Sequence, residues 1–172
     1  MENKVIKTIK SRVSCRNFSN KKVELSKVKL IAEAGKMAPS AKNRQICNIL
    51  VLRSKKYVDK LKALSMEVFQ RDCFYGANTL MLVYAPREDR FCDTDCSCVL
   101  ENMFVAATSL NVHSCWINQV DDMFNTEKGK KIKKSFGIPE NARVGGTCAI
   151  GYSEDPSVLK VKERKEDFIK IL

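Results

Sequence analysis

Apolar residues recur at helical spacing in several segments of the chain, which predicts amphipathic helices there. The longest such segment covers 93–110 and is apolar around most of its circumference. Its apolar positions are Val99, Leu100, Met103, Phe104, Ala106, Ala107 and Leu110. A helix of this kind is buried on most faces, so we expect it at the centre of the fold. Shorter helices are predicted over 3–11, 25–38, about 57–68 and 126–136.

Four other segments are short apolar runs bounded by turn signals, which predicts buried strands. They cover 46–52, 79–84, 112–118 and 144–152. Pro86 ends the second run, because proline cannot donate a hydrogen bond within a sheet. The chain contains no internal repeat, low-complexity segment or linker. Residues 1–172 are therefore expected to form one α+β domain with about four core strands and five helices.

The size and composition favour a soluble globular protein. A chain of 172 residues buries a hydrophobic core without cross-links. Hydrophobic residues make up 44% of it and charged residues 30%. The longest apolar runs, such as Thr79–Ala85, are too short to cross a bilayer. The first residues lead into a charged helical pattern without the apolar core of a signal peptide, so we expect no membrane association and a cytoplasmic location.

The net charge of +11 leaves two explanations open. An anionic partner, such as nucleic acid, a membrane surface or a phosphorylated cofactor, is attracted by such a charge. A lysine-rich solvated surface explains most of it equally well. The lysines between Lys128 and Lys134 have no interleaved aromatic residues and match no nucleic-acid-binding motif. We interpret them as a solvated helix face and expect no nucleic-acid partner.

The eight cysteines are expected to be reduced, because a chain of this length needs no disulfides and carries no secretory signal. Cys47, Cys115 and Cys148 lie in apolar runs and are expected to act as small buried hydrophobic residues. Cys96 and Cys98 would point about 200° apart on a helix, so they cannot share a metal ion with Cys92. We therefore predict no metal site.

The sequence lacks the residues and motifs that several kinds of active site require. The only histidine is His113, which excludes a multi-histidine metal site. His113 lies in an apolar run, and we expect it to be structural. The sequence contains neither a nucleophile elbow nor either of the glycine-rich nucleotide fingerprints.

A basic array follows the first predicted helix. Arg12, Ser14 and Arg16 alternate along a segment that is expected to be extended, so all three point the same way. Two guanidinium groups and a hydroxyl on one face form a clamp suited to a phosphate group. Basic triplets of this kind are also common on protein surfaces.

A second polar segment, 38–45, lies between a predicted helix and a buried strand. Its small residues allow a close approach of the backbone, and Asn43 and Gln45 each offer donor and acceptor groups. Such groups suit the edge of a heterocycle or a ribityl chain. An ordinary loop that ends a helix is the alternative interpretation.

Taken together with two later motifs, these segments resemble the nitroreductase family of FMN-dependent oxidoreductases. One later motif runs from Asp95 through Glu101-Asn102-Met103 to Ser114-Cys115-Trp116-Ile117. The other comprises Phe136-Gly137-Ile138-Pro139, Cys148-Ala149-Ile150-Gly151-Tyr152 and the basic tail. The resemblance covers about residues 5–168. It implies a central, mostly antiparallel sheet of four to five strands flanked by helices, with a long buried central helix.

The resemblance also implies a homodimer with FMN at the subunit interface. It assigns no catalytic residue, because the flavin carries the chemistry. The tail, about 160–172, is expected to pack on the partner subunit. The resemblance implies that Arg12, Val13, Ser14 and Arg16 bind the cofactor and that Lys162 and Arg164 add to the binding of its phosphate. The loop that reaches the partner's flavin contributes Pro39, Ser40, Ala41, Asn43 and Gln45. Trp116, Ile117 and Asn118 are implied to act through their backbone.

The implied activity passes electrons from NADH or NADPH through FMN to a small aromatic acceptor, such as a nitroaromatic or a quinone, in ping-pong fashion. The chain departs from the family where Ile46 and Cys47 stand in place of a frequent Pro-Trp pair. It is also short for the family. These departures keep a second hypothesis open, a flavin-binding sensor or carrier without general reductase activity. A basic nucleic-acid-binding protein is the third hypothesis.

Overall fold

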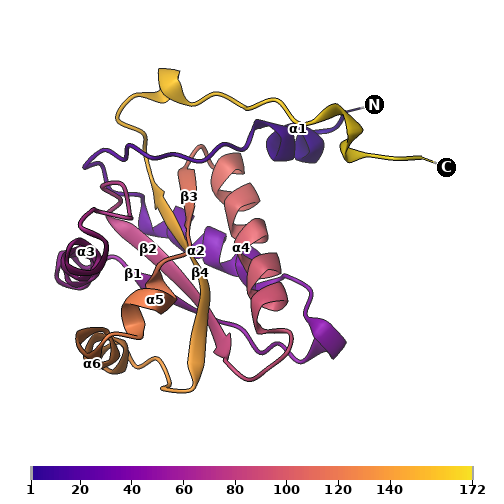
Figure 1. Cartoon of the computed structure of the whole chain (residues 1–172). Coiled ribbons are helices and arrows are strands. Elements are labelled where there is room, and N and C mark those ends of the chain that lie inside the picture. Colours follow the sequence, from indigo (N-terminus) through magenta and orange to yellow (C-terminus); the bar gives the residue numbers. More distant parts are fainter. Residues whose placement is uncertain (1, 172) are drawn as a thin grey trace.

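The computed structural model describes residues 2–171, which form an antiparallel four-stranded sheet with helices on both faces (Figure 1). The strand order is β1-β2-β4-β3, and all neighbouring strands are antiparallel. The strands are β1 (Asn48–Leu52), β2 (Thr79–Pro86), β3 (His113–Ile117) and β4 (Ala142–Gly151). All four predicted strands are therefore present. β1 begins later than the expected 46–52 and leaves Ile46 and Cys47 outside the sheet.

Six α-helices surround the sheet in the described part of the chain, one more than expected. They are α1 (Lys4–Ser11), α2 (Leu25–Lys36), α3 (Lys55–Phe69), α4 (Cys92–Ser109), α5 (Val120–Phe124) and α6 (Glu127–Ser135). Short 3-10 turns, η1 to η3, cover Ala41–Asn43, Pro156–Val158 and Glu166–Phe168. The helix that the sequence did not predict is α5. Its five residues are too few for a helical period to be detected.

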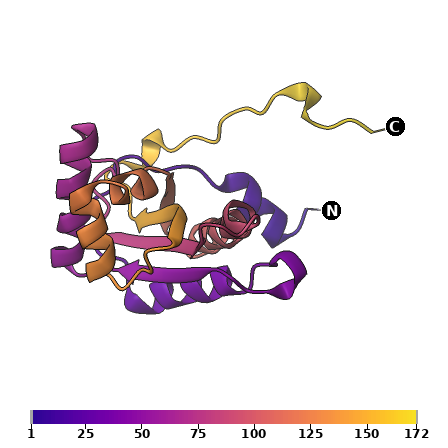
Figure 2. The ribbon, with the colours of Figure 1, turned by 60° about the horizontal axis from the view of Figure 1, so that its bottom comes forward.

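Helices cover both faces of the sheet (Figure 2), and a hydrophobic layer lies on each face. Strand β2 contributes to both, because successive side chains of a strand point to opposite faces. Leu80 and Leu82 pack with α3, α5 and α6, whereas Met81 and Val83 pack with α2 and α4. The predicted central helix is α4, which buries eight residues. A Cβ atom on Gly35 of α2 would come within 2.7 Å of Met103, so glycine permits the close packing of α2 on α4.

Asp121, on the short helix α5, is a buried carboxylate that ties this helix to the sheet. The guanidinium of Arg87 donates to both of its oxygens at 3.0 Å, and the backbone N–H of Val144 donates to Oδ1 at 3.0 Å. The Asp121 side chain is only 11% exposed. These bonds place the start of β4 against α5.

The two ends of the described chain carry apolar side chains that this chain leaves uncovered. Helix α1 has the expected amphipathic pattern but buries no residue, and Ile6 and Ile9 are 43% and 48% exposed. Residues 160–171 are all exposed, including Phe168 and Ile169. Figures 1 and 2 show the tail crossing above α1 and standing away from the sheet. Leu172, the last residue of the predicted tail, lies outside the described residues. No helix among residues 2–171 is long and apolar enough to span a membrane.

Candidate functional site

The basic array 12–16 is held on the edge of the sheet beside β3. Ser14 and Ser114 form an isolated parallel bridge, and the backbone N–H of Cys15 donates to the carbonyl oxygen of Ser114 at 2.9 Å. The Cys15 side chain is completely buried in the core. Because alternate side chains of an extended segment point in opposite directions, Ser14 and Arg16 face away from the core. The expected alternation holds for Ser14, Cys15 and Arg16, whereas Val13 lines the same cavity as its neighbours Arg12 and Ser14.

The chain after the array is fixed against the end of β4. Phe18 bridges to Ser153, and the backbone N–H of Glu154 donates to the carbonyl oxygen of Asn17 at 2.8 Å. The side-chain oxygen of Asn17 accepts a hydrogen bond from the Ser153 hydroxyl at 2.9 Å. The array and the residue that follows it are therefore anchored at both ends before any ligand binds.

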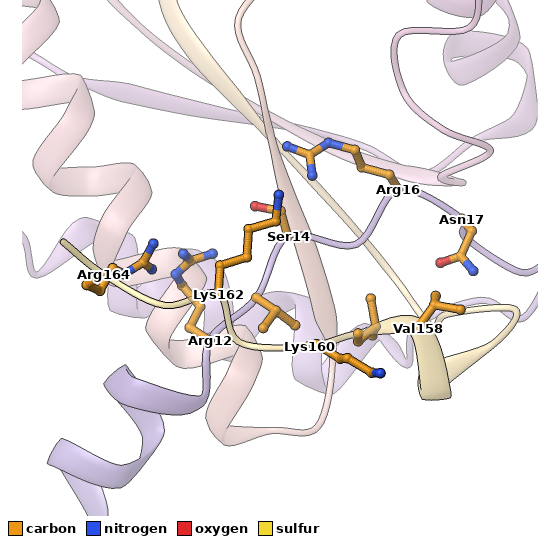
Figure 3. Close-up of a pocket in the computed structure, with 10 residues that line it drawn as sticks. Arg12, Ser14, Arg16, Asn17, Val158, Lys160, Lys162 and Arg164 are labelled. Carbon is orange, nitrogen blue, oxygen red and sulfur yellow. The ribbon is translucent and has the colours of Figure 1, made fainter.

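A cavity of about 440 Å³ opens between this segment and the C-terminal tail (Figure 3). Figure 3 shows Lys162 of the tail pointing toward Ser14, whereas Lys160 points away from it. The lining residues are Arg12, Val13, Ser14, Arg16, Asn17, Val158, Leu159, Lys160, Lys162 and Arg164. We call this space the basic cavity.

The basic cavity concentrates positive charge. Five of its lining residues are arginine or lysine and none is acidic. Within residues 2–171, none of these five forms a salt bridge. Their field reaches into the protein: burial raises the pKa of the Cys115 thiol, and the charges of Arg16 and Arg12 oppose that rise. Convergent cations without partners suit an anionic ligand, and arginine pairs in particular suit phosphate oxygens.

Six of the predicted site residues meet in the basic cavity. They are Arg12, Val13, Ser14, Arg16, Lys162 and Arg164. The prediction missed Asn17, Val158, Leu159 and Lys160. The alternation of basic residues at 160, 162 and 164 was a signal that could have included Lys160. Asn17 directly follows the array, but nothing in the sequence indicated that the Ser153 hydroxyl holds its side chain in place.

The loop 39–45 is a tightly bonded turn at the N-terminal end of α4. The backbone N–H of Ala41 donates to both carboxylate oxygens of Asp95 at 3.2 and 3.3 Å. Arg44 pairs with Asp89 at 2.7 Å. Lys42, Asn43 and Gln45 adopt φ angles between 51° and 56°, which are unfavourable for residues other than glycine and asparagine. Such strain persists only where the surrounding bonds determine the conformation, so this loop is rigidly shaped.

The same loop borders a second cavity of about 390 Å³, which does not include any residue of the basic cavity. Pro39, Ser40 and Gln45 line it, but Ala41 and Asn43 do not. The other lining residues are Ala32, Glu33, Lys36, Ala38, Cys47, Asn48, Ile49, Asp95 and Val99. Within one chain, the predicted loop residues and the predicted phosphate clamp are therefore separate. We call this second space the loop cavity.

Trp116, Ile117 and Asn118 line neither of these cavities. The Trp116 ring is packed against Phe104 with the ring centres 5.8 Å apart, and the residue is 39% exposed. Ile117 is buried in the core. The backbone N–H of Asn118 donates to the side-chain oxygen of Gln119 at 3.1 Å. The role predicted for these three residues uses their backbone groups, which lie at the end of β3 and directly after it.

Comparison with known proteins assigns the chain to a family. The profile of the Nitroreductase family matches residues 9–152, most of the chain. The chain belongs to the nitroreductase family. A relative from Archaeoglobus fulgidus, named as a candidate NADH dehydrogenase/NAD(P)H nitroreductase, is 28% identical over 155 residues, which cover 87% of this chain and 86% of the relative.

Solved structures of other nitroreductases have the same fold. The nitroreductase of Bacteroides fragilis with bound FMN is 31% identical, covers 99% of this chain and 100% of its own, and superposes with a TM-score of 0.91. The nitroreductase of Desulfitobacterium hafniense with bound FMN covers 100% of both chains with a TM-score of 0.90 at 24% identity. The predicted nitroreductase-like α+β fold is confirmed.

Two other predictions about this nitroreductase-family chain can be compared with its structure. The ring nitrogen Nδ1 of His113 accepts a hydrogen bond from the backbone N–H of Ser153 at 3.0 Å, and burial lowers the pKa of the ring. This is the structural role expected for it. In the lysine-rich helix α6, Lys128 pairs with Glu67, Lys130 pairs with Glu127, and the buried Lys133 donates to the carbonyl oxygens of two residues near β4.

The cysteine predictions are confirmed in part. All eight cysteines are free, and Cys115 and Cys148 are buried as expected. Cys96 is buried whereas Cys98 is exposed, in agreement with their opposite directions on α4. The prediction for Cys47 was wrong. This residue precedes β1 instead of lying inside it, and its half-buried side chain lines the loop cavity.

Proposed function

We propose that this nitroreductase-family protein is an FMN-dependent oxidoreductase that acts as a homodimer with FMN at the subunit interface. The observation that carries the proposal is the basic cavity, which is lined by five cations that have no salt-bridge partner among residues 2–171. The FMN-bound nitroreductase of Bacteroides fragilis, which is 31% identical to this chain, supports the choice of ligand.

The residues of the basic cavity fit the phosphate end of FMN. Arg12 and Arg16 provide planar guanidinium groups for a phosphate dianion, and the Ser14 hydroxyl lies between them in the sequence. Lys162 and Arg164 add charge from the tail. Val13 and Leu159 add apolar surface to the same cavity, which suits the carbon chain that joins phosphate and ring.

A second subunit would complete the site. The uncovered apolar residues of α1 and of the tail, such as Ile9 and Phe168, support a dimer interface on this side of the molecule. In the proposed dimer, Pro39, Ser40, Ala41, Asn43 and Gln45 approach the FMN bound by the other subunit. The backbone of Trp116, Ile117 and Asn118 would help to hold the ring system of FMN. The rigid loop 39–45 is suited to this task, because its shape is fixed before the cofactor arrives.

When bound, FMN would accept a hydride from NADH or NADPH and pass the electrons to a small aromatic acceptor, such as a nitroaromatic or a quinone, in ping-pong fashion. The side chains of the chain would bind and orient the cofactor. The positive charge of Arg12, Arg16 and Lys162 would stabilise negative charge in the cavity. The eight free cysteines are typical of a reducing compartment, which supports the cytoplasm as the location.

A flavin-binding sensor or carrier without general reductase activity is the second candidate function. It is favoured by Ile46 and Cys47, which stand where the family often has a Pro-Trp pair. Cys47 leaves the loop cavity without an aromatic wall on that side. An acceptor that stacks on a flavin is held less firmly when such a wall is missing.

Titration of the ligand-free protein with FMN and with riboflavin tests the proposal. Flavin fluorescence is measured at low and at moderate salt. We expect FMN to bind much more tightly than riboflavin and to weaken with salt, because the basic cavity binds phosphate. Equal affinities would contradict the phosphate clamp. Turnover of NADH or NADPH with a quinone then distinguishes the reductase from the sensor or carrier.

A further inference from the structure

Two thiols face each other at the loop cavity. The sulfur atoms of Cys47 and Cys96 are 3.7 Å apart, within hydrogen-bonding distance for sulfur. Cys96 is completely buried on the first turns of α4, whereas Cys47 is half-buried and lines the loop cavity. A small molecule in that cavity therefore reaches the sulfur of Cys47 before that of Cys96.

The surroundings of the pair hold the Cys96 side chain in place and leave Cys47 freer to move. Cys96 is held by the helix and by Gly145, whose position is so close that an added Cβ would lie 2.5 Å from the Cys96 Cβ. Cys47 lies in the irregular residues between the loop 39–45 and β1. A disulfide requires a sulfur separation of about 2.05 Å, so the two atoms must approach by roughly 1.7 Å. A side-chain rotation or a small backbone shift at Cys47 supplies a movement of that size.

The two thiols also differ in reactivity. The hydrogen bond from the Cys96 thiol lowers the pKa of Cys47, although burial and the charges of Asp95 and Asp89 oppose this. The hydrogen bond to Cys47 and burial raise the pKa of Cys96. Burial also raises the pKa of Cys92, one turn earlier on α4. Because the thiolate is the reactive form, Cys47 is the nucleophile of this cluster.

We propose that Cys47 and Cys96 form an oxidisable dithiol that a hydroperoxide converts to a disulfide. The Cys47 thiolate attacks one peroxide oxygen and the O–O bond breaks, which leaves a sulfenic acid on Cys47 and a hydroxide that takes up the proton lost by the Cys47 thiol to give water. The Cys96 thiol then attacks the Cys47 sulfur and forms the S–S bond. The departing hydroxyl takes the Cys96 proton and leaves as water. With hydrogen peroxide, two thiols are oxidised and one peroxide is reduced to two waters.

The disulfide would act on the loop beside it. Asp95, the neighbour of Cys96, already holds the backbone N–H of Ala41. A Cys47–Cys96 bond would attach the other end of the loop to the same helix, so oxidation would fasten the loop 39–45 to α4 at both ends. The proposal concerns the thiols alone and holds whether or not the chain binds FMN.

The test exposes the full-length protein to one equivalent of hydrogen peroxide and then alkylates the remaining thiols under denaturing conditions. Peptide mass spectrometry before and after reduction identifies each modified cysteine. We expect a peptide pair joined through Cys47 and Cys96 that separates on reduction, with Cys92 and Cys98 alkylated. The substitution Cys98→Ser removes the exposed thiol of the same helix and should leave the joined pair unchanged.

Two variants resolve the order of events. In Cys47→Ser, the Cys96 thiol should stay alkylatable after peroxide, because the reactive thiol is gone. In Cys96→Ser, Cys47 should accumulate as a sulfenic acid that dimedone traps. Three results would overturn the proposal: Cys47 oxidised beyond the sulfenic state while Cys96 is alkylated, Cys92 joined to Cys96 instead, or Cys47 alkylated as fully as in the untreated protein.

Discussion

The backbone N–H of Cys15 donates a hydrogen bond to the carbonyl oxygen of Ser114 at 2.9 Å, and this bond orients the basic array. It holds the array along the edge strand β3 with the Cys15 side chain in the core. Ser14 and Arg16 must then face the basic cavity. The proposed phosphate clamp is therefore anchored to the edge of the sheet.

Replacing Arg16 by alanine is expected to weaken FMN binding at least tenfold, because one charge-assisted hydrogen bond contributes about 1.5–3 kcal/mol. Flavin fluorescence titration measures the effect. Lys131→Ala on helix α6 is the matched control, since it removes an exposed cation outside the basic cavity. Equal FMN affinity in both variants and in the parent protein would contradict the clamp.

Deleting residues 160–172 is expected to lower FMN affinity and to shift the protein from dimer to monomer. The deletion removes Lys160, Lys162 and Arg164 from the basic cavity together with the exposed apolar tail. Size-exclusion chromatography with light scattering gives the mass, and fluorescence titration gives the affinity. Phe168→Asp leaves the three cations in place, so it should weaken the dimer but lower FMN affinity less than the deletion does. A truncated protein that stays dimeric would show that the tail does not embrace the partner.

Asp121→Asn is expected to lower the free energy of unfolding by about 1–3 kcal/mol, because it removes the buried charge that Arg87 and the Val144 N–H bond. Partial exposure of Arg87 keeps the loss below that of a fully buried pair. Urea unfolding measures the change. Asp122→Asn is the control, since Asp122 is the exposed neighbour on the same helix. A similar loss in both variants would exclude a special role for Asp121.

His113 is expected to make stability depend on pH. Burial lowers its pKa in the folded protein, so the unfolded chain binds the proton more readily. This contribution is complete above the ordinary histidine pKa of about 6.5, and it is lost as the pH falls below that value and through the lower pKa of the folded state.

His113→Asn checks this dependence, because the asparagine oxygen can accept the Ser153 N–H at the Nδ1 position and does not titrate. The melting temperatures of both proteins are compared between about pH 7 and about pH 5. The parent protein should lose more stability than the variant over this range. Parallel curves would show that His113 does not titrate differently on folding.

Periodicity predicted most of the fold because the long elements have clear patterns. Strand β2 is apolar on both faces, which predicted a buried strand, and the apolar residues of helix α4 wrap most of its circumference, which predicted a central helix. The five-residue helix α5 left no such signal. Cys47 was placed in a strand because its neighbours are apolar, yet the bonded loop before it delays the start of the sheet until Asn48.

The candidate site was predictable where residues two apart in the sequence lie on the same side of an extended segment. Arg12, Ser14 and Arg16 follow that rule, and the pairing of Cys15 with Ser114 preserves it. Lys162 lies near this array only because of the path that the tail takes, and no local sequence pattern specifies that path. The thiol pair Cys47 and Cys96 likewise depends on long-range packing.

The most direct test of whether the protein binds FMN and is reduced by NADH or NADPH is a visible absorption spectrum. The spectrum is recorded on protein purified without added flavin and again after anaerobic addition of NADH and then NADPH. We expect a flavin band that bleaches with at least one of the two nucleotides. A flavin band that neither nucleotide bleaches would favour the sensor or carrier. A colourless protein that cannot be reconstituted with FMN would contradict the proposed function.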